Sequence, residues 1–313
     1  MVVPRVTVLA GGVGGARLAH GIALAGVSPD VVVNVGDDTE LHGLWISPDL
    51  DTVLYTLAGL NDEERGWGLR GETYATLTQL AALGEDTWFT LGDKDLATHI
   101  ARTARLRAGA PLSEVTAQLA AALGVNARLL PVTDDRVATL VDTPSGRLAF
   151  QEYFVRRRHA DAVLSVEFEG IDAARPAPGV LDAVADADVV IIAPSNPFLS
   201  VFPVLGVAGV REAVRATAAR RVAVSPIVGG QAIKGPAAQI LETLGHDVSA
   251  LGVARLYTGL VDVMVVDDTD VALAPAIRDL GLEVVVTDTI MGGPAGRERL
   301  ARQVLAVAGH ALP

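Results

Sequence analysis

The chain has 313 residues, of which 50% are hydrophobic and 20% charged, a balance that predicts one large or two smaller folded domains and excludes a disordered chain. Acidic residues outnumber basic ones by 37 to 25, and the formal net charge of -12 argues against sequence-independent nucleic-acid binding, which needs a basic surface. Cysteine is absent, so disulfides, thiolate nucleophiles and cysteine-ligated metal clusters are excluded.

Short β-branched segments alternate along the chain with longer segments rich in Ala and Leu. This alternation is typical of a parallel sheet covered by helices, and the short segments are apolar throughout, as strands buried on both faces are. The expected strands are 6–10, 31–35, 188–193, 221–224, 261–266 and 282–287, and the expected helices are 16–25, 211–219, 236–244, 271–280 and 295–308. We therefore predict the α/β class: a Rossmann-like, mostly parallel sheet with helices on both faces.

The middle of the chain departs from this alternation. Residues 61–124 have a mostly helical pattern and residues 128–170 a β-like one, in which Thr143-Pro144-Ser145-Gly146 is a turn that predicts a hairpin. We interpret residues 61–170 as an inserted helical and β-hairpin region that covers the substrate. Residues 1–60 and 171–313 then form a Rossmann-like nucleotide-binding core.

A glycine-rich segment joins the first expected strand to the first helix. Residues 11–17 read Gly-Gly-Val-Gly-Gly-Ala-Arg, and glycines before a helix N-terminus let backbone N–H groups approach an anion, so we predict a phosphate site. The dinucleotide fingerprint fits poorly because Arg17 stands where its third glycine belongs, and a P-loop is absent because Gly235 follows Lys234. A tight turn without a ligand is the alternative. The expected phosphate contacts are Gly11, Gly12, Gly14, Gly15 and Arg17.

Two acidic segments follow the second strand. Asp37 and Asp38 stand at its carboxyl end, where open parallel sheets bind ligands, and two carboxylates beside a phosphate site indicate a divalent cation, most simply Mg²⁺. The alternatives are a turn with solvated acids, or Asp37 as the ribose-binding acid of a nicotinamide enzyme. Farther on, Asp49 or Asp51 either caps a helix, joins Asp37 on a metal ion, or accepts a hydrogen bond from a substrate hydroxyl.

Three further loops carry polar residues at expected strand or helix ends. Residues 90–99 form a turn and a charged helix start, in which Lys94 could hold a phosphate or carboxylate or be merely solvated. Ser195 and Asn196 follow strand 188–193, and Ser225 and Gly229 follow strand 221–224. We predict that these two loops contact a nucleotide, the alternative being plain proline-containing loops.

Six segments in this order resemble the 2-phospho-L-lactate transferase family. The segments are 10–17, 34–38, 47–52, 91–99, 194–197 and 225–227. The resemblance implies an enzyme of coenzyme F-420 biosynthesis that joins a phosphorylated three-carbon acid, enolpyruvyl or 2-lactyl phosphate, to the ribityl hydroxyl of the deazaflavin Fo. The donor would be the guanosine diphosphate ester of the acid, and GMP would leave. The family fold is Rossmann-like with an inserted region, and its members tend to be homodimers.

Phosphoryl-type transfer needs positioning and charge neutralisation, which a glycine cradle, an arginine and a magnesium ion provide. We therefore predict Asp37 and Asp51 as the catalytic residues, and Asp37, Asp38 and Asp51 as the metal-facing acids. By the resemblance, Asp51 and the turn from Thr90 to Lys94 lie against the deazaflavin. The guanine nucleotide would lie along the glycine segment and the loops of Ser195, Asn196, Ser225 and Gly229.

The sequence also suggests two other functions. The order strand, glycines, helix, strand and Asp suggests an NAD-dependent oxidoreductase, and related members of the same superfamily suggest a non-catalytic, nucleotide-sugar-binding regulator. The segments 48–52 and 92–99 favour the transferase. We expect no nucleic-acid or membrane partner, because no run of about 18 apolar residues is present, and we expect a cytoplasmic protein.

Overall fold

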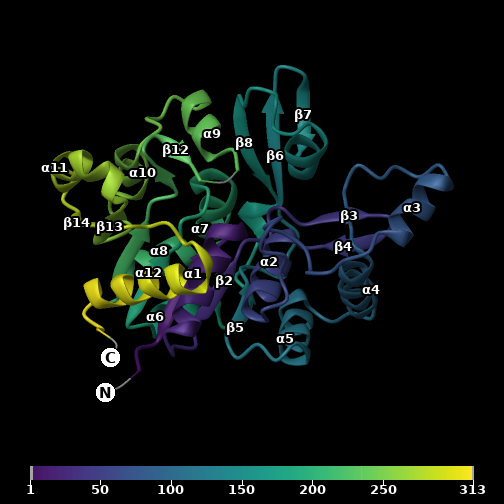
Figure 1. The fold of residues 1–313 in the computed structure, drawn as a ribbon, viewed down its shortest axis with the longest axis horizontal. Helices are drawn as coiled ribbons and strands as arrows, with labels where there is room; N and C mark the ends of the chain where they lie inside the picture. The colour runs from purple at the N-terminus through teal and green to yellow at the C-terminus, as the bar shows by residue number, and fades with distance from the viewer. Residues whose placement is uncertain (1–2, 234, 312–313) are drawn as a thin grey trace.

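A seven-stranded parallel sheet forms the centre of the molecule (Figure 1). The computed structural model describes residues 3–233 and 235–311, so Lys234 lies outside the described residues. The strand order is β14-β13-β10-β9-β1-β2-β5, and every neighbouring pair is parallel. The strands are β1 (Val6–Ala10), β2 (Asp30–Val33), β5 (Arg128–Pro131), β9 (Val189–Ile192), β10 (Arg220–Val224), β13 (Val263–Val266) and β14 (Glu283–Val286). The predicted fold class is confirmed.

The chain adds strands to the sheet in opposite directions from β1 and from β9. From β1 the chain passes through α1 (Gly12–Leu24) to β2 on one side, whereas from β9 it proceeds to β10, β13 and β14 on the other side. Right-handed crossovers in opposite directions place their helices on opposite faces of the sheet. The loops after β1 and β9 therefore diverge at a topological switch point, which is where open α/β sheets bind ligands.

Helices cover both faces of this sheet. Helix α1 packs between α2 (Pro48–Leu57) and α12 (Gly293–Val307) on the face turned toward the viewer in Figure 1, and α6 (Val180–Ala185) and α8 (Val210–Ala216) lie behind the sheet. The other helices of this part are α7 (Phe202–Gly206), α9 (Ala237–Thr243), α10 (Ala250–Tyr257) and α11 (Ala274–Arg278), with short turns at Ile171–Ala173, Pro197–Val201 and Asp268–Leu273. Helix α10 was not expected from the sequence.

The glycine segment is helical rather than a loop. Helix α1 begins at Gly12, ahead of the predicted start at residue 16, and Gly11 is its extended N-cap residue. Close packing explains this start: a Cβ at Gly14 would meet the Pro194 carbonyl oxygen at 2.1 Å, and a Cβ at Gly15 would meet Ala10 Cβ at 2.7 Å. Only glycine lets the first turn of α1 approach the ends of β1 and β9 this closely.

The region between β2 and β9 adds helices and small antiparallel sheets. It contains β3 (Thr39–Leu41), β4 (Leu44–Ile46), α3 (Ala75–Ala82), α4 (Asp93–Arg107), α5 (Leu112–Ala122), β6 (Ala138–Thr143), β7 (Gly146–Ala149), the π-helical turn Glu152–Arg156 and β8 (Ser165–Glu169). A further two-stranded hairpin joins β11 (Ile227–Val228) to β12 (Gln231–Ala232). Thr143 pairs with Gly146, which confirms the predicted hairpin turn.

The position of strand β5 affects where the core ends and the inserted region begins. It lies within residues 61–170 yet pairs with β2 as the edge strand of the central sheet, whereas β6, β7 and β8 form a separate sheet. We therefore propose a division in which β5 belongs to the core.

The interior of the sheet is aliphatic. Strands β1, β9 and β13 are buried at every position, as their sequences predict. Among the described residues, no single helix is long and apolar enough to cross a bilayer. One bent pair, Pro197–Gly206 with Val210–Ala216, meets that test by length and composition alone.

Candidate active site

The loops after β1 and β9 are joined by direct hydrogen bonds at the switch point. Ser195 Oγ donates to the Gly11 carbonyl oxygen at 2.7 Å and accepts from the Gly11 N–H at 3.3 Å. Ser195 is buried, and both hydrogen-bonding roles of its hydroxyl are used within the protein. Ser195 therefore fixes the glycine segment in place and leaves no donor of its own for a ligand.

Two buried carboxylates lie beside the start of α1. Asn34 Nδ2 donates to Asp49 Oδ2 at 2.9 Å and lies 3.4 Å from Asp37 Oδ1, so one amide group bridges the two acids. Asp49 Oδ2 lies 2.7 Å from the position of a Cβ at Gly11. Residues from β2, the following turn and the first turn of α2 thus converge on the N-terminus of α1.

Neither carboxylate of this pair contacts a cationic side chain among the described residues. Burial, and then the charges of Asp49 and Asp38, hold the pKa of Asp37 well above its usual range. Burial raises the pKa of Asp49 to about 6, although hydrogen bonds from Asn34 and the Gly12 backbone oppose the shift. The pair therefore carries negative charge that the protein itself does not neutralise, and it favours a cation or a proton.

Asp38 is held by the β3–β4 hairpin. Trp45 Nε1 and Ser47 Oγ donate to Asp38 Oδ2 at 2.9 and 2.8 Å, whereas Asp38 Oδ1 is buried with no hydrogen-bond partner among the described residues. Burial raises the pKa of Asp38 to about 7 against these two hydrogen bonds. Asp38 also lines a pocket of about 190 Å³ with Trp45 and Arg136, whose guanidinium lies 5.9 Å from the Trp45 ring centre.

Asp51 points into a different environment. Its carboxylate accepts from Arg102 Nη1 at 3.0 Å and from Arg102 Nη2, and its Oδ2 lies 3.6 Å from His99 Nδ1. Both Arg102 and His99 belong to α4 and are 1% exposed. The structure therefore brings Asp37 and Asp49 together, while Asp51 pairs with an arginine that the sequence analysis did not identify.

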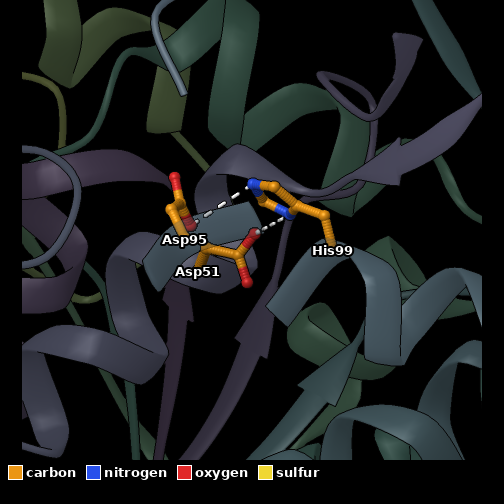
Figure 2. A group of neighbouring side chains, drawn as sticks. All are labelled: Asp51, Asp95 and His99. Atoms are coloured by element: carbon orange, nitrogen blue, oxygen red, sulfur yellow. Dashed lines mark ion pairs between the residues drawn. The ribbon is translucent and has the colours of Figure 1, made fainter. Parts of the chain in front are cut away.

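The network continues along α4. Figure 2 shows the His99 ring between two carboxylates, with Asp51 on one side and Asp95 on the other. His99 Nε2 lies 3.3 Å from Asp95 Oδ1, which also accepts from the Tyr55 hydroxyl at 2.7 Å. Burial alone would raise the pKa of Asp95, but the contacts with His99 and Tyr55 outweigh burial and lower it.

Asp51, Asp95 and His99 lie close enough together to hold a metal ion, with ligand atoms within 4.8 Å of one another. The charge of Arg102 opposes that role. Its guanidinium already contacts both Asp51 oxygens, and Nη1 lies 3.2 Å from His99 Nδ1. Because a guanidinium only donates hydrogen bonds, Nδ1 accepts and is not free for a metal. The cluster is better described as a buried ion-pair network.

The turn from Thr90 to Lys94 is capped from within the protein. The Glu72 carboxylate accepts from the N–H groups of Lys94 and Asp95, both at 2.9 Å, and so takes the donors at the start of α4. The side chain of Lys94 donates to the Arg70 carbonyl oxygen at 3.1 Å, and both Thr90 and Lys94 are exposed. The helix start is therefore not a free anion site, although this edge faces solvent.

The three remaining predicted nucleotide contacts are Ser225, Gly229 and Asn196, and they differ in whether a hydrogen-bonding group is left for a ligand. Ser225 Oγ bonds the Ile227 backbone, and the Gly229 N–H donates to Asp270 at 3.1 Å, so both groups are used within their loops. Asn196 Oδ1 accepts from two N–H groups of the turn that follows, whereas its Nδ2 is buried without a partner among the described residues. Asn196 is thus the one of the three with an unused donor.

Arg17 lies on the side of α1 that faces α12. Burial and then the charge of the neighbouring Arg297 lower the pKa of Arg17, and Glu63 opposes this shift. Arg297 is itself 1% exposed and pairs with Glu63. Arg17 is half-buried, and because Glu63 pairs with Arg297, one positive charge of these three residues is left beside α1.

Three residues of the site were not identified from the sequence: Asn34, Arg102, and Asp49 as the acid beside the glycines. Asn34 stood in the 34–38 segment without an assigned role. Arg102 carried a usable signal, because Asp95, His99 and Arg102 recur at i, i+4 and i+7 and so share one face of α4. Charged residues at core spacing indicate a buried polar network.

The fold and the acidic site define an α/β protein whose acidic site lies at the carboxyl ends of its parallel strands, where open α/β sheets bind ligands. Residues 6–303 match the model of the family described as 2-phospho-L-lactate transferase CofD. The chain belongs to the 2-phospho-L-lactate transferase family, and it is a transferase of the phospholactate and phosphoenolpyruvate type.

Relatives agree with this assignment. A protein of Streptomyces griseus named phosphoenolpyruvate transferase is 43% identical over 312 residues, with 97% of this chain and 98% of the relative covered. Its namesake in Nocardia farcinica is 42% identical over 321 residues, covering 98% and 95%. A solved structure of a UPF0052 family protein from Bacillus halodurans has a TM-score of 0.67 at 16% identity, covering 97% of this chain and 99% of that one, and supports the fold alone.

Proposed function

We propose that the chain transfers an enolpyruvyl phosphate group from its guanosine diphosphate ester to the ribityl hydroxyl of the deazaflavin Fo, in the biosynthesis of coenzyme F-420. Family membership supports the transferase type, and the relatives' name, phosphoenolpyruvate transferase, favours the enolpyruvyl over the 2-lactyl group. Family membership also removes the support for an NAD-dependent oxidoreductase. The homodimer remains a prediction from the resemblance, and the cytoplasmic location remains a prediction from the sequence.

The reaction is a displacement at phosphorus. The ribityl hydroxyl oxygen forms a bond to the phosphorus that carries the three-carbon acid, and the bond from that phosphorus to the bridging diphosphate oxygen breaks. GMP leaves with the bridging oxygen, and the hydroxyl proton passes to a carboxylate or to solvent. Such a step needs alignment and neutralisation of phosphate charge more than covalent help from the protein.

The observation that carries the proposal is the uncompensated acid pair at the glycine segment. Asp37 and Asp49 offer hard oxygen donors without a cationic partner among the described residues, and Asp38 Oδ1 is a further unpartnered oxygen nearby. This donor set fits Mg²⁺, which prefers carboxylate oxygens. When bound, Mg²⁺ would neutralise phosphate charge and lower the pKa of a bound hydroxyl.

The chain's own groups then divide the work. Asp37 and Asp49 hold the cation, and Asn34 orients both carboxylates through its amide. A carboxylate oxygen of this pair that the cation leaves free would accept the hydroxyl proton. We assign Asp51 an indirect role, since Arg102 occupies its carboxylate.

For the nucleotide, we propose that the N–H groups of the first turn of α1 beyond Gly12 face the diphosphate, since the Gly12 N–H donates to Asp49, and that Asn196 Nδ2 donates to the ligand. Ser195, Ser225 and Gly229 would act through the shape of their loops, because their hydrogen-bonding groups are already used. Gly14 and Gly15 would act in the same way, through close packing. Arg17 would contribute positive charge from α1, and the exposed Thr90 and Lys94 would border the deazaflavin.

The test is direct synthesis. The purified protein is incubated with Fo, Mg²⁺ and either the enolpyruvyl or the 2-lactyl guanosine diphosphate ester, and GMP and the deazaflavin product are followed by mass spectrometry. We expect one GMP for each product, with faster turnover of the enolpyruvyl ester. Release of GMP without a deazaflavin product, or no reaction with either ester, would contradict the proposal. Faster use of the lactyl ester would overturn the choice of acid alone.

A further inference from the structure

Helix α4 holds the segment of chain that carries the site's acids. Arg102 pairs with Asp51 on the first turn of α2, and the adjacent Thr103 accepts from the Trp45 N–H at 2.7 Å in the β3–β4 hairpin. Trp45 in turn bonds Asp38. Two consecutive residues of α4 are therefore bonded to two places in the segment that runs from Asp38 to Asp51.

The first turn of α2 presents its two acids to opposite partners. Asp49 accepts from Asn34 and lies over Gly11, whereas Asp51 accepts from Arg102. Two residues of separation on a helix rotate the side chains by about 200°. Any movement of this turn that weakens the contact of Asp51 therefore also moves Asp49 relative to Asp37.

We propose that Arg102 is a positioning residue of the acidic site: through its two-pronged contact with Asp51 it fixes the first turn of α2 against α4 and so holds Asp49 beside Asp37. The inference rests on the role proposed above for Asp37 and Asp49. It assigns a task to a buried arginine that touches neither of these two acids.

The environment of Arg102 suits this role. Arg102 and Asp51 are both buried, so neither charge can be solvated if its partner is lost. Arg102 Nη1 also donates to His99 Nδ1, which places the ring proton on Nε2, toward Asp95. Asp95 accepts from Tyr55 of α2 as well. The contact between α2 and α4 is therefore made at two points, and the guanidinium orientation is fixed from both sides.

A double-mutant cycle tests the proposal. Arg102→Gln leaves the Asp51 charge buried and unpaired, so the first turn of α2 moves and we expect the Kd for Mg²⁺, measured by calorimetry, to rise by about tenfold or more. We expect kcat to fall with it, while the Kd for GDP without Mg²⁺ changes little. Asp51→Asn combined with Arg102→Gln removes both charges, and most of the Mg²⁺ affinity should return.

Arg255→Gln is the matched control, because it also takes an arginine from an aspartate partner, Asp247, but at an exposed position on α10. It should behave like the wild type. If the double variant is no better than Arg102→Gln, the charge of Asp51 is itself required and the proposal is wrong. If Arg102→Gln does not fold, Arg102→Lys takes its place, with a smaller rise in the Kd for Mg²⁺; a wild-type Kd would overturn the proposal.

A crystal structure of the Arg102 variant separates this inference from the proposed function. The Asn34–Asp49 hydrogen bond should be broken there and restored in the double variant, whatever reaction the enzyme performs. An unmoved Asp49 would overturn the positioning role. Failure of the wild type to form product from Fo would instead contradict the proposed function and leave the structural comparison valid.

Discussion

The carboxylate of Asp49 lies against the backbone of Gly11, so close that a Cβ at Gly11 would meet Asp49 Oδ2 at 2.7 Å. The absence of a side chain at Gly11, the N-cap residue of α1, therefore leaves room for the Asp49 carboxylate. The same Cβ would meet Ser200 Cβ at 2.5 Å. Asp49 and Ser200 therefore approach each other closely at Gly11 because this residue has no side chain.

Gly11→Ala should displace Asp49 and Ser200 together. We expect the free energy of unfolding to fall by about 1–3 kcal/mol, as overpacking does, and Mg²⁺ affinity to fall with it. Gly292→Ala is the control, because Gly292 has a negative φ and open space around it; it should be neutral or slightly stabilising. Urea unfolding and calorimetry measure the two effects. Unchanged Mg²⁺ binding in Gly11→Ala would contradict the placement of Asp49.

Removing one charge from the pair Asp37 and Asp49 should raise the stability of the ligand-free protein and weaken the binding of Mg²⁺. Asp49→Asn keeps an oxygen acceptor for Asn34 but relieves the repulsion from Asp37, so the ligand-free protein should melt at a higher temperature than the wild type. The same change removes a proposed cation ligand, so added Mg²⁺ should no longer raise Tm. Differential scanning fluorimetry with and without Mg²⁺ provides both values. A lower Tm without ligand would show that the pair is not mutually repulsive.

The stability of the ligand-free protein should fall as pH rises through the weakly acidic range. Burial raises the pKa of Asp38 from 3.8 to about 7 and that of Asp49 from 3.8 to about 6. Between the unfolded-state pKa of 3.8 and these folded-state values, the folded protein holds protons that the unfolded protein has lost. Because the unfolded state binds fewer protons, the free energy of unfolding decreases with pH over this window. It levels off only after the pH has passed the folded-state pKa values of Asp38 and of Asp37, which is raised as well.

Urea unfolding at about pH 5 and about pH 7.5 measures this slope. The double variant Asp38→Asn, Asp49→Asn should have a flatter profile, and Mg²⁺ should restore stability at the higher pH. A free energy of unfolding that rises between the two pH values would contradict the assignment.

The sheet and its switch point were predictable because they depend on local patterns. β1 and β9 are apolar runs bounded by glycine or proline, and the glycines after β1 indicated that a helix follows. Parallel strands then place the residues at their carboxyl ends along one edge, which brought Asp37 to the glycines without any knowledge of distances.

The assignment among the acids of α2 was not predictable from the sequence. Asp49 and Asp51 are two residues apart, and only the rotation of the helix decides which one faces Gly11. That rotation depends on Arg102, which lies 51 residues beyond Asp51 in the chain. Lys94 shows the same limit, since Glu72, 22 residues before it, takes the donor that a ligand was expected to use.

Glu72 and Asp93 cap each other's helices. Glu72 accepts from the first N–H groups of α4, and Asp93 accepts from the N–H groups of Ala75 and Thr76 at the start of α3, both at 3.0 Å. The hydrogen bond from Thr73 Oγ1, and then those from Thr76 and Ala75, lower the pKa of Asp93. Together with the two hydrogen bonds to Glu72, they hold residues 72–76 against the turn before α4.

Glu72→Ala should cost about 0.5–2 kcal/mol of unfolding free energy, as loss of a cap does, and free the start of α4. If the Thr90–Lys94 turn borders the deazaflavin, KM for Fo should rise while the Kd for GDP stays constant. Glu85→Ala is the control, as an exposed acid in the same region. An unchanged KM for Fo would remove this turn from the acceptor site.

The two polar atoms of the Asn196 side chain have different roles, one structural and one proposed to bind the ligand. Its Oδ1 accepts from the Phe198 and Leu199 N–H groups at 2.9 and 3.2 Å, while its Nδ2 has no partner among the described residues. Asn196→Asp keeps an acceptor for the cap, so the hydrogen bonds from the Phe198 and Leu199 N–H groups should persist. It replaces the free donor by negative charge, so the Kd for GDP should rise by about tenfold or more.

Asn196→Ala provides the complementary control, because it removes the cap and the donor together. It should lower the free energy of unfolding by about 1 kcal/mol and also weaken GDP binding. Calorimetric titration with GDP and urea unfolding of both variants distinguish the two roles. If Asn196→Asp binds GDP like the wild type, the unused donor of Asn196 does not face the nucleotide, and the loop after β9 contributes only its shape.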